Sequence, residues 1–158
     1  MHTAHHSPST TIDATIPHAI DPLVLANHEA HALRDGDVML FISDDRHASD
    51  DLFAWAHQTG NSVLDVESLD ERRSGYYIQK GQRWAPSVVL DARGQRCPTP
   101  IIEAGRRLRF LAADEVLRLI SDCPAARSDV SAWCQSTGHT LLDVVRDARG
   151  VESFYIRK

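Results

Sequence analysis

The tripeptide Ile120-Ser121-Asp122 ends a short apolar run, and the same tripeptide occurs 78 residues earlier as Ile42-Ser43-Asp44. The same spacing continues on both sides without a gap. It relates Asp13-Ala14 to Asp91-Ala92, Pro22 to Pro100, Ala54-Trp55 to Ala132-Trp133, Thr59-Gly60 to Thr137-Gly138, Leu64-Asp65-Val66 to Leu142-Asp143-Val144, and Tyr77-Ile78 to Tyr155-Ile156. A constant offset over whole segments indicates two copies of one domain in tandem.

The repeat divides the chain into four segments. Residues 1–11 are polar and are expected to form a disordered lead-in. Residues 12–80 form the first copy, residues 81–87 a linker and residues 88–158 the second copy. A domain of this size is small but can fold by itself.

Hydrophobic periodicity predicts the same order of elements in each copy: strand, helix, strand, helix, strand, strand. In the second copy, apolar residues recur at three- and four-residue steps over 98–112 and 124–137, which predicts helices. Segments 88–91, 115–120, 139–145 and 153–157 are β-like, and residues 147–150 favour a hairpin turn. We therefore expect two tandem βαβαββ domains, each a two-layer α/β (α+β) sandwich of two helices on a four-stranded mixed sheet.

The amino-acid composition narrows the range of possible functions. The hydrophobic fraction of 42% and the charged fraction of 25% are typical of a globular protein, and no apolar stretch is long enough to cross a membrane. The N-terminus does not resemble a secretory signal, and three cysteines argue against a disulfide framework, so we expect a cytoplasmic protein. The net charge of −5 disfavours direct nucleic-acid binding.

The two copies differ in charge. Residues 12–80 contain 13 acidic and 5 basic residues, against 9 acidic and 11 basic residues in 88–158. This asymmetry in charge fits two alternatives: surfaces that bind different partners, or drift of charge on faces that are exposed to solvent.

Cys97 lies between the first expected strand and the first expected helix of the second copy. Pro98 suits the first position of a helix, which makes Cys97 the predicted N-cap. The positive end of the helix dipole, together with Arg93 and Arg96, would then favour a reactive thiolate. The alternative is an unreactive surface thiol that precedes a proline.

The stretch Leu90-Asp91-Ala92-Arg93-Gly94-Gln95-Arg96-Cys97-Pro98-Thr99-Pro100 resembles the signature of the TusA/SirA-like family, in which Cys-Pro-x-Pro follows Leu-Asp-x-x-Gly. The resemblance covers the whole second copy and implies a sulfur carrier or sulfurtransferase. Cys97 would accept sulfane sulfur from a donor such as a cysteine desulfurase and relay it, as a persulfide, to an acceptor protein. Pro98 and Pro100 would shape the helix start, and no cofactor or metal is implied. Transfer RNA thiolation, molybdenum cofactor synthesis and sulfur oxidation all remain open as pathways.

The first copy departs from the family pattern at the decisive position. The offset places Ala19 opposite Cys97 and Ile20 opposite Pro98, although Pro22 is retained. We therefore interpret residues 12–80 as a degenerate copy without the cysteine, serving as a structural or docking partner.

The other two cysteines have different expected roles. Cys123 precedes Pro124 as Cys97 precedes Pro98, which predicts a second N-cap, and parallel neighbouring strands would bring both turns to one sheet edge. Cys123 could then resolve a persulfide or disulfide on Cys97; the alternative is a solitary exposed thiol. Cys134 lies on an apolar helical stripe and is expected in the core.

Two other functions remain open at this stage. One is a non-catalytic regulatory or scaffold module in which both copies serve as docking surfaces. The other is a thiol redox protein that uses Cys97 and Cys123. The nine histidines form no recognisable ligand pattern, so no metal site is expected.

Overall fold

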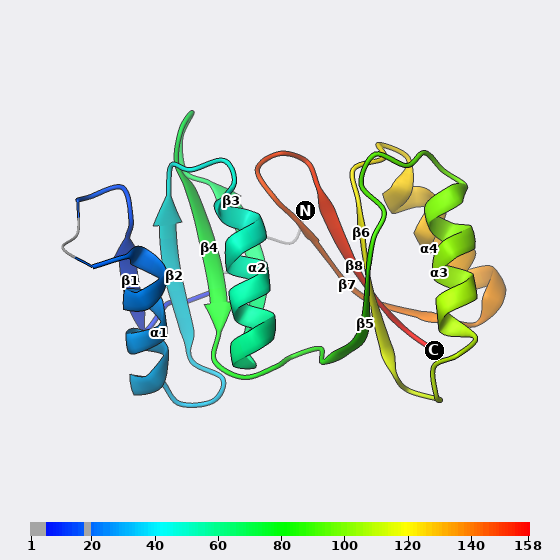
Figure 1. Ribbon diagram of the computed structural model, residues 1–158, viewed down its shortest axis with the longest axis horizontal. Helices are drawn as coiled ribbons and strands as arrows, with labels where there is room; N and C mark the ends of the chain where they lie inside the picture. Colours follow the sequence, from blue (N-terminus) through cyan, green and yellow to red (C-terminus); the bar gives the residue numbers. More distant parts are fainter. Residues whose placement is uncertain (1–5, 18–19) are drawn as a thin grey trace. The chain divides into compact units, whose positions relative to one another are not determined.

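The computed structural model describes residues 6–17 and 20–158, and the chain divides into two compact units, Met1–Arg83 and Trp84–Lys158. Each unit contains one four-stranded sheet and two helices (Figure 1). Residues 1–5 of the expected lead-in lie outside the described residues, and the first strand already begins at Thr10.

The two units repeat one order of elements, which confirms the predicted βαβαββ fold. The N-terminal unit consists of β1 (Thr10–Asp13), α1 (Pro22–Ala32), β2 (Val38–Ser43), α2 (Ala48–Thr59), β3 (Ser62–Ser68) and β4 (Ser74–Gln79). The C-terminal unit consists of β5 (Pro86–Asp91), α3 (Thr99–Leu108), β6 (Val116–Ser121), α4 (Ala126–Thr137), β7 (Thr140–Arg146) and β8 (Glu152–Arg157).

Strand pairing is also the same in the two sheets. Their strand orders are β1-β2-β4-β3 and β5-β6-β8-β7. The first two strands of each sheet are parallel, as expected for strands joined through a helix, and the remaining pairs are antiparallel. Equivalent residues also pair in the two sheets. Phe41 pairs with Tyr76, and their counterparts 78 residues later, Leu119 and Phe154, pair with each other.

Two irregularities recur at equivalent positions. The register of β3 shifts between Val63 and Asp65, and that of β7 shifts between Leu141 and Asp143. The second helix of each unit ends at a glycine with a left-handed backbone, Gly60 at φ 72° and Gly138 at φ 78°, a conformation that favours glycine. The sequence repeat is therefore a repeat of local backbone structure as well.

The core of the C-terminal unit lies between its sheet and its two helices, which cover the same side of the sheet (Figure 1). Its fully buried members from the strands and helices are Ala104, Leu108, Leu117, Leu119, Ala126, Val130, Cys134, Phe154 and Ile156. The presence of Cys134 among them, 2% exposed, confirms its expected place in the core. Among the described residues, every helix is too short or too polar to cross a membrane.

Candidate functional site

The turns that follow β5 and β6 meet at one edge of the C-terminal sheet. The N–H of Ala92 donates a hydrogen bond to the carbonyl of Ile120 at 2.8 Å. Gly94 has a left-handed backbone, with φ 80°, and its N–H donates to the Oδ1 atom of Asp122 at 2.9 Å. These bonds join the turn that holds Cys97 to the turn that holds Cys123, as the parallel strands predicted.

Both helices begin later than the sequence indicated. Helix α3 starts at Thr99 with Pro98 as its N-cap, and α4 starts at Ala126 with Ala125 as its N-cap. The prediction that Cys97 and Cys123 are N-caps is therefore wrong. A turn precedes each helix: the Thr99 N–H donates to the Arg96 carbonyl and the Ala126 N–H to the Cys123 carbonyl, both at 3.0 Å.

The two prolines of the Cys97 turn have different surroundings. The Cys97–Pro98 peptide bond is cis, and Pro98 is exposed. Pro100 is fully buried at the start of α3, where it needs no N–H partner and anchors the helix against the core. The start of α3, and with it Cys97, is thus fixed to the unit by packing.

Cys97 and Cys123 are both half-buried, and both pack against the core of the C-terminal unit. Their thiols are close enough for each to shift the pKa of the other: Cys123 raises the pKa of Cys97, and the backbone of Cys97 and Ala125 lowers the pKa of Cys123. The two cysteines therefore share one edge of the sheet.

The groups around Cys97 disfavour its thiolate. Burial, the contact with Cys123 and the carboxylate of Asp129 together raise the pKa of Cys97 to about 12. This direction runs against the sequence-based expectation of a Cys97 thiolate in a positive field, which stays a prediction. Local helix polarity suggested that expectation, whereas the charges that act on Cys97 come from the turn after β6 and from α4.

Arg93 and Arg96 are the cations that the sequence placed near Cys97. The guanidinium of Arg93 binds the carboxylate of Asp91, with Nη2 and Oδ2 2.6 Å apart, and lowers the pKa of Asp91. Arg96 is exposed. Their predicted role in stabilising a persulfide anion stays a prediction.

Asp129 is the functional candidate that sequence reasoning missed. It lies in the first turn of α4, where an acidic side chain is usually explained by the helix dipole, and its equivalent in the first copy is Asp51. In the structure its carboxylate lies close enough to the Cys97 thiol to raise the pKa of that thiol. The available signal was an acidic residue kept at the same position in both copies.

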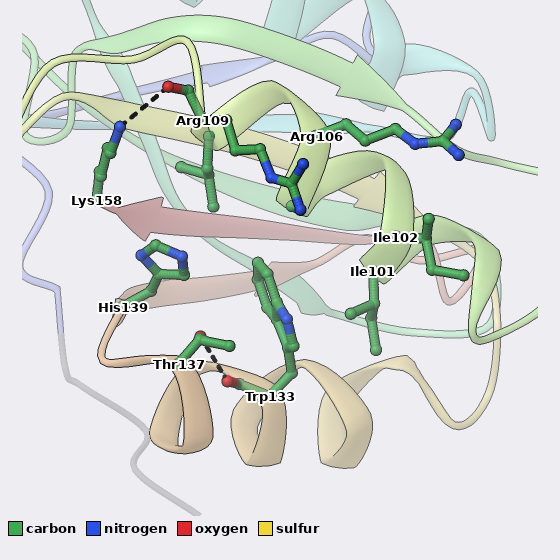
Figure 2. Close-up of a pocket in the computed structure, with 10 residues that line it drawn as sticks. Ile101, Ile102, Arg106, Arg109, Trp133, Thr137, His139 and Lys158 are labelled. Carbon is green, nitrogen blue, oxygen red and sulfur yellow. Dashed lines mark hydrogen bonds between the residues drawn. The ribbon is translucent and has the colours of Figure 1, made fainter.

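A groove of about 850 Å³ is lined mainly by residues of α3 and α4 (Figure 2). Ile101 and Ile102 line it near the start of α3, and the rings of Trp133 and His139 lie 5.3 Å apart along it. The Nζ atom of Lys158 donates to the carbonyl of Arg109 at 3.2 Å on its border. Neither Cys97 nor Cys123 lines this groove.

The N-terminal unit has a pocket of about 220 Å³ at the equivalent edge of its own sheet. Asp45 and Asp51 line it and are the counterparts of Cys123 and Asp129, and Asp21 and Asp44 also face it. Ala19, the counterpart of Cys97, lies outside the described residues. The frame of the site is repeated, but the described part of this pocket is acidic and holds no thiol. Across the described residues, no cluster of three or more histidine, cysteine or acidic side chains could bind a metal ion.

The C-terminal unit, which contains Cys97 and Cys123, is similar to known proteins. The family model described as sulfurtransferase TusA matches residues 88–158. The sulfur carrier protein TusA of Pseudomonas putida strain GB-1 is 39% identical over 75 residues, which are 48% of this chain and 92% of that protein. The corresponding protein of Pseudomonas entomophila strain L48 is 39% identical over 71 residues, 45% of this chain and 88% of that protein. The crystal structure of a SirA-like protein from Desulfitobacterium hafniense is 24% identical, has a TM-score of 0.41 and covers 44% of this chain and 95% of that one. Residues 88–158 include Cys97, Cys123 and Asp129.

Proposed function

Because this chain belongs to the TusA family of sulfur carrier proteins, we propose that it accepts sulfane sulfur as a persulfide on Cys97 and relays it to an acceptor protein. The observation that supports this role is the place of Cys97. It is a half-buried thiol in an irregular turn of the unit that the family matches, within the stretch Cys97-Pro98-Thr99-Pro100. Turn residues held by a rigid frame are common sites of chemistry that partner proteins must reach.

The proposed transfer moves one sulfur atom between thiols. The sulfur of Cys97 attacks the terminal sulfur of a donor persulfide, the donor's S–S bond breaks, and a new S–S bond forms on Cys97. The leaving donor thiolate takes up the Cys97 proton, so no cofactor or metal is consumed. Delivery to the acceptor repeats these steps with Cys97 as the leaving group. The protein is in this sense a carrier-type sulfurtransferase.

The proposed partners are a sulfur donor, such as a cysteine desulfurase, and a downstream acceptor protein, both in the cytoplasm. We further propose that the N-terminal unit is a degenerate copy of the same domain. Its support is the shared strand order, together with alanine at the position of Cys97. Its acidic pocket suits a docking or structural role better than sulfur chemistry, because nearby carboxylates disfavour a thiolate.

One other function has a specific contact in its favour. The closeness of the Cys97 and Cys123 thiols, each of which shifts the pKa of the other, suits a thiol redox protein that cycles between a dithiol and a disulfide. A regulatory or scaffold role is the third alternative, and it requires that the protein works without Cys97.

Intact-protein mass spectrometry tests the carrier role. The full chain is incubated anaerobically with a cysteine desulfurase and cysteine, beside the Cys97→Ser variant and a Cys134→Ala control. We expect adducts of about 32 Da per sulfur atom in the wild type and in the control, and none in Cys97→Ser. Adducts that persist in Cys97→Ser would overturn the assignment of Cys97. An absence of adducts from every form would favour the redox or scaffold role.

A further inference from the structure

The contact between Cys97 and Cys123 places a second sulfur beside the one that would carry the cargo. The turns that hold the two cysteines are joined by hydrogen bonds from Ala92 to Ile120 at 2.8 Å and from Gly94 to Asp122 at 2.9 Å. Both cysteines pack against the same core, and each thiol shifts the pKa of the other. Thiol–disulfide chemistry requires such access of one sulfur to another.

We propose that Cys123 resolves the Cys97 persulfide: its thiolate attacks the inner sulfur, forms a Cys97–Cys123 disulfide and releases hydrosulfide. This inference rests on the proposed carrier function and adds a discharge route to it. The bond between the two sulfurs of the persulfide breaks, and the bond between the Sγ atoms of Cys97 and Cys123 forms. The sulfane sulfur is reduced to hydrosulfide and the two cysteines are oxidised, so this step needs no external oxidant.

Attack at the inner sulfur is favoured over transfer of the outer sulfur to Cys123. The inner sulfur is the Sγ atom of Cys97, with which Cys123 is already in contact. Transfer of the outer sulfur to Cys123 would expel the Cys97 thiolate, as delivery to an acceptor does, and would only move the persulfide from one cysteine to the other. Hydrosulfide is a weaker base than a cysteine thiolate, and the weaker base is the better leaving group in thiol–disulfide exchange.

The discharged protein must be reset by a reductant. A dithiol, supplied by a protein or as a small molecule, would exchange with the Cys97–Cys123 disulfide and return both thiols. The third cysteine is not a candidate for either step, because Cys134 is 2% exposed within the core. The N-terminal unit has Asp45 where Cys123 stands, and a carboxylate cannot form this bond.

The experiment follows the fate of the sulfur after loading. Wild type, Cys123→Ser, Cys97→Ser and the Cys134→Ala control are loaded anaerobically with a cysteine desulfurase and cysteine, then freed from the donor and from cysteine. Intact mass and released hydrosulfide are measured over time. In the wild type we expect the adduct of about 32 Da to decay to a monomer about 2 Da lighter than the reduced chain, with about one hydrosulfide released per chain.

The variants separate this inference from the carrier function. In Cys123→Ser the adduct should persist at least about tenfold longer, without a disulfide, because the attacking thiolate is missing. A wild-type adduct that lasts as long as that of Cys123→Ser, or that decays without a disulfide, would overturn the inference and leave the carrier function in place. The absence of any adduct from both proteins would instead remove the carrier function. Wild type kept without donor should stay reduced, and a disulfide that forms there equally fast would also count against the inference.

Discussion

The turns after β5 and β6 of the C-terminal unit bring Cys97, Cys123 and Asp129 together, whereas the equivalent turns of the N-terminal unit carry Asp45 and Asp51 around an acidic pocket. Outside these turns the two units share their strand order and the register shift in their third strand. The comparison shows that a fold and its chemistry can vary separately. Apolar and glycine positions maintain the frame, and a few turn positions determine whether the frame presents thiols or carboxylates.

The largest expected effect tests whether the two units are independent. Phe154 and Tyr76 occupy equivalent core positions, 0% and 1% exposed, so truncation of either to alanine should cost its own unit about 3–5 kcal/mol of unfolding free energy. We expect Phe154→Ala to abolish loading of Cys97, and Tyr76→Ala to leave it within about twofold. Hydrogen exchange locates the destabilised unit and mass spectrometry measures loading.

An equal loss of loading in Tyr76→Ala and Phe154→Ala would break the comparison. The C-terminal unit would then need an intact N-terminal unit for its chemistry. A loss confined to Phe154→Ala would sharpen the view that the sulfur site is self-contained.

A smaller effect concerns the carboxylate beside the thiol pair. Asp129 raises the pKa of Cys97, and its charge also opposes the Cys123 thiolate, so Asp129→Asn should lower the pKa of both thiols. Below its pKa, Cys97 then has more thiolate, and its alkylation at pH 8 should become roughly three- to tenfold faster. Peptide mass spectrometry after timed alkylation resolves the two cysteines. Asp51→Asn is the matched control and should change neither rate; a slower Cys97 in Asp129→Asn would contradict the assigned contact.

The smallest effect concerns the buried thiol. Cys134 stands where the N-terminal unit has Ala56, and both are 2% exposed, so Cys134→Ala should cost about 1 kcal/mol of unfolding free energy at neutral pH.

This small cost should depend on pH. Burial raises the pKa of the Cys134 thiol from its ordinary value of 9.0 to about 11. Above pH 9 the unfolded chain loses this proton while the folded chain keeps it, so wild-type stability falls between pH 9 and pH 11. Urea unfolding at pH 7 and pH 10 should therefore show the difference between wild type and Cys134→Ala shrinking at the higher pH. A constant difference would mean that the Cys134 thiol titrates normally in the folded protein.

The fold could be predicted because the sequence contains the pattern of one domain twice. The constant offset of 78 residues related Thr59-Gly60 to Thr137-Gly138, and these glycines end equivalent helices. The starts of α3 and α4 were harder to predict. Proline suits the first turn of a helix, but it does not exclude a separate turn before the helix begins, and Pro98 and Pro124 lie in such turns.

The sequence could name the residues of a candidate site, but it could not give the electrostatics around them. The motif identified Cys97, and the parallel strands suggested that Cys123 could be near it. The protonation of Cys97 depends on burial and on two groups that follow it by 26 and 32 positions in the chain, Cys123 and Asp129. The sequence around Cys97 does not reveal such contacts, because they form only when the folded sheet brings the two turns together.

The contact between Cys97 and Cys123 has a kinetic consequence. Two sulfurs in one chain react at a rate that does not depend on protein concentration, whereas delivery to a separate acceptor speeds up as the acceptor becomes more abundant. If the protein carries sulfur as proposed, the fraction of sulfur that reaches the acceptor would depend on the relative rates of a first-order and a second-order process. A carrier built in this way would retain its sulfur only briefly, and its yield of transferred sulfur would report how much acceptor is present.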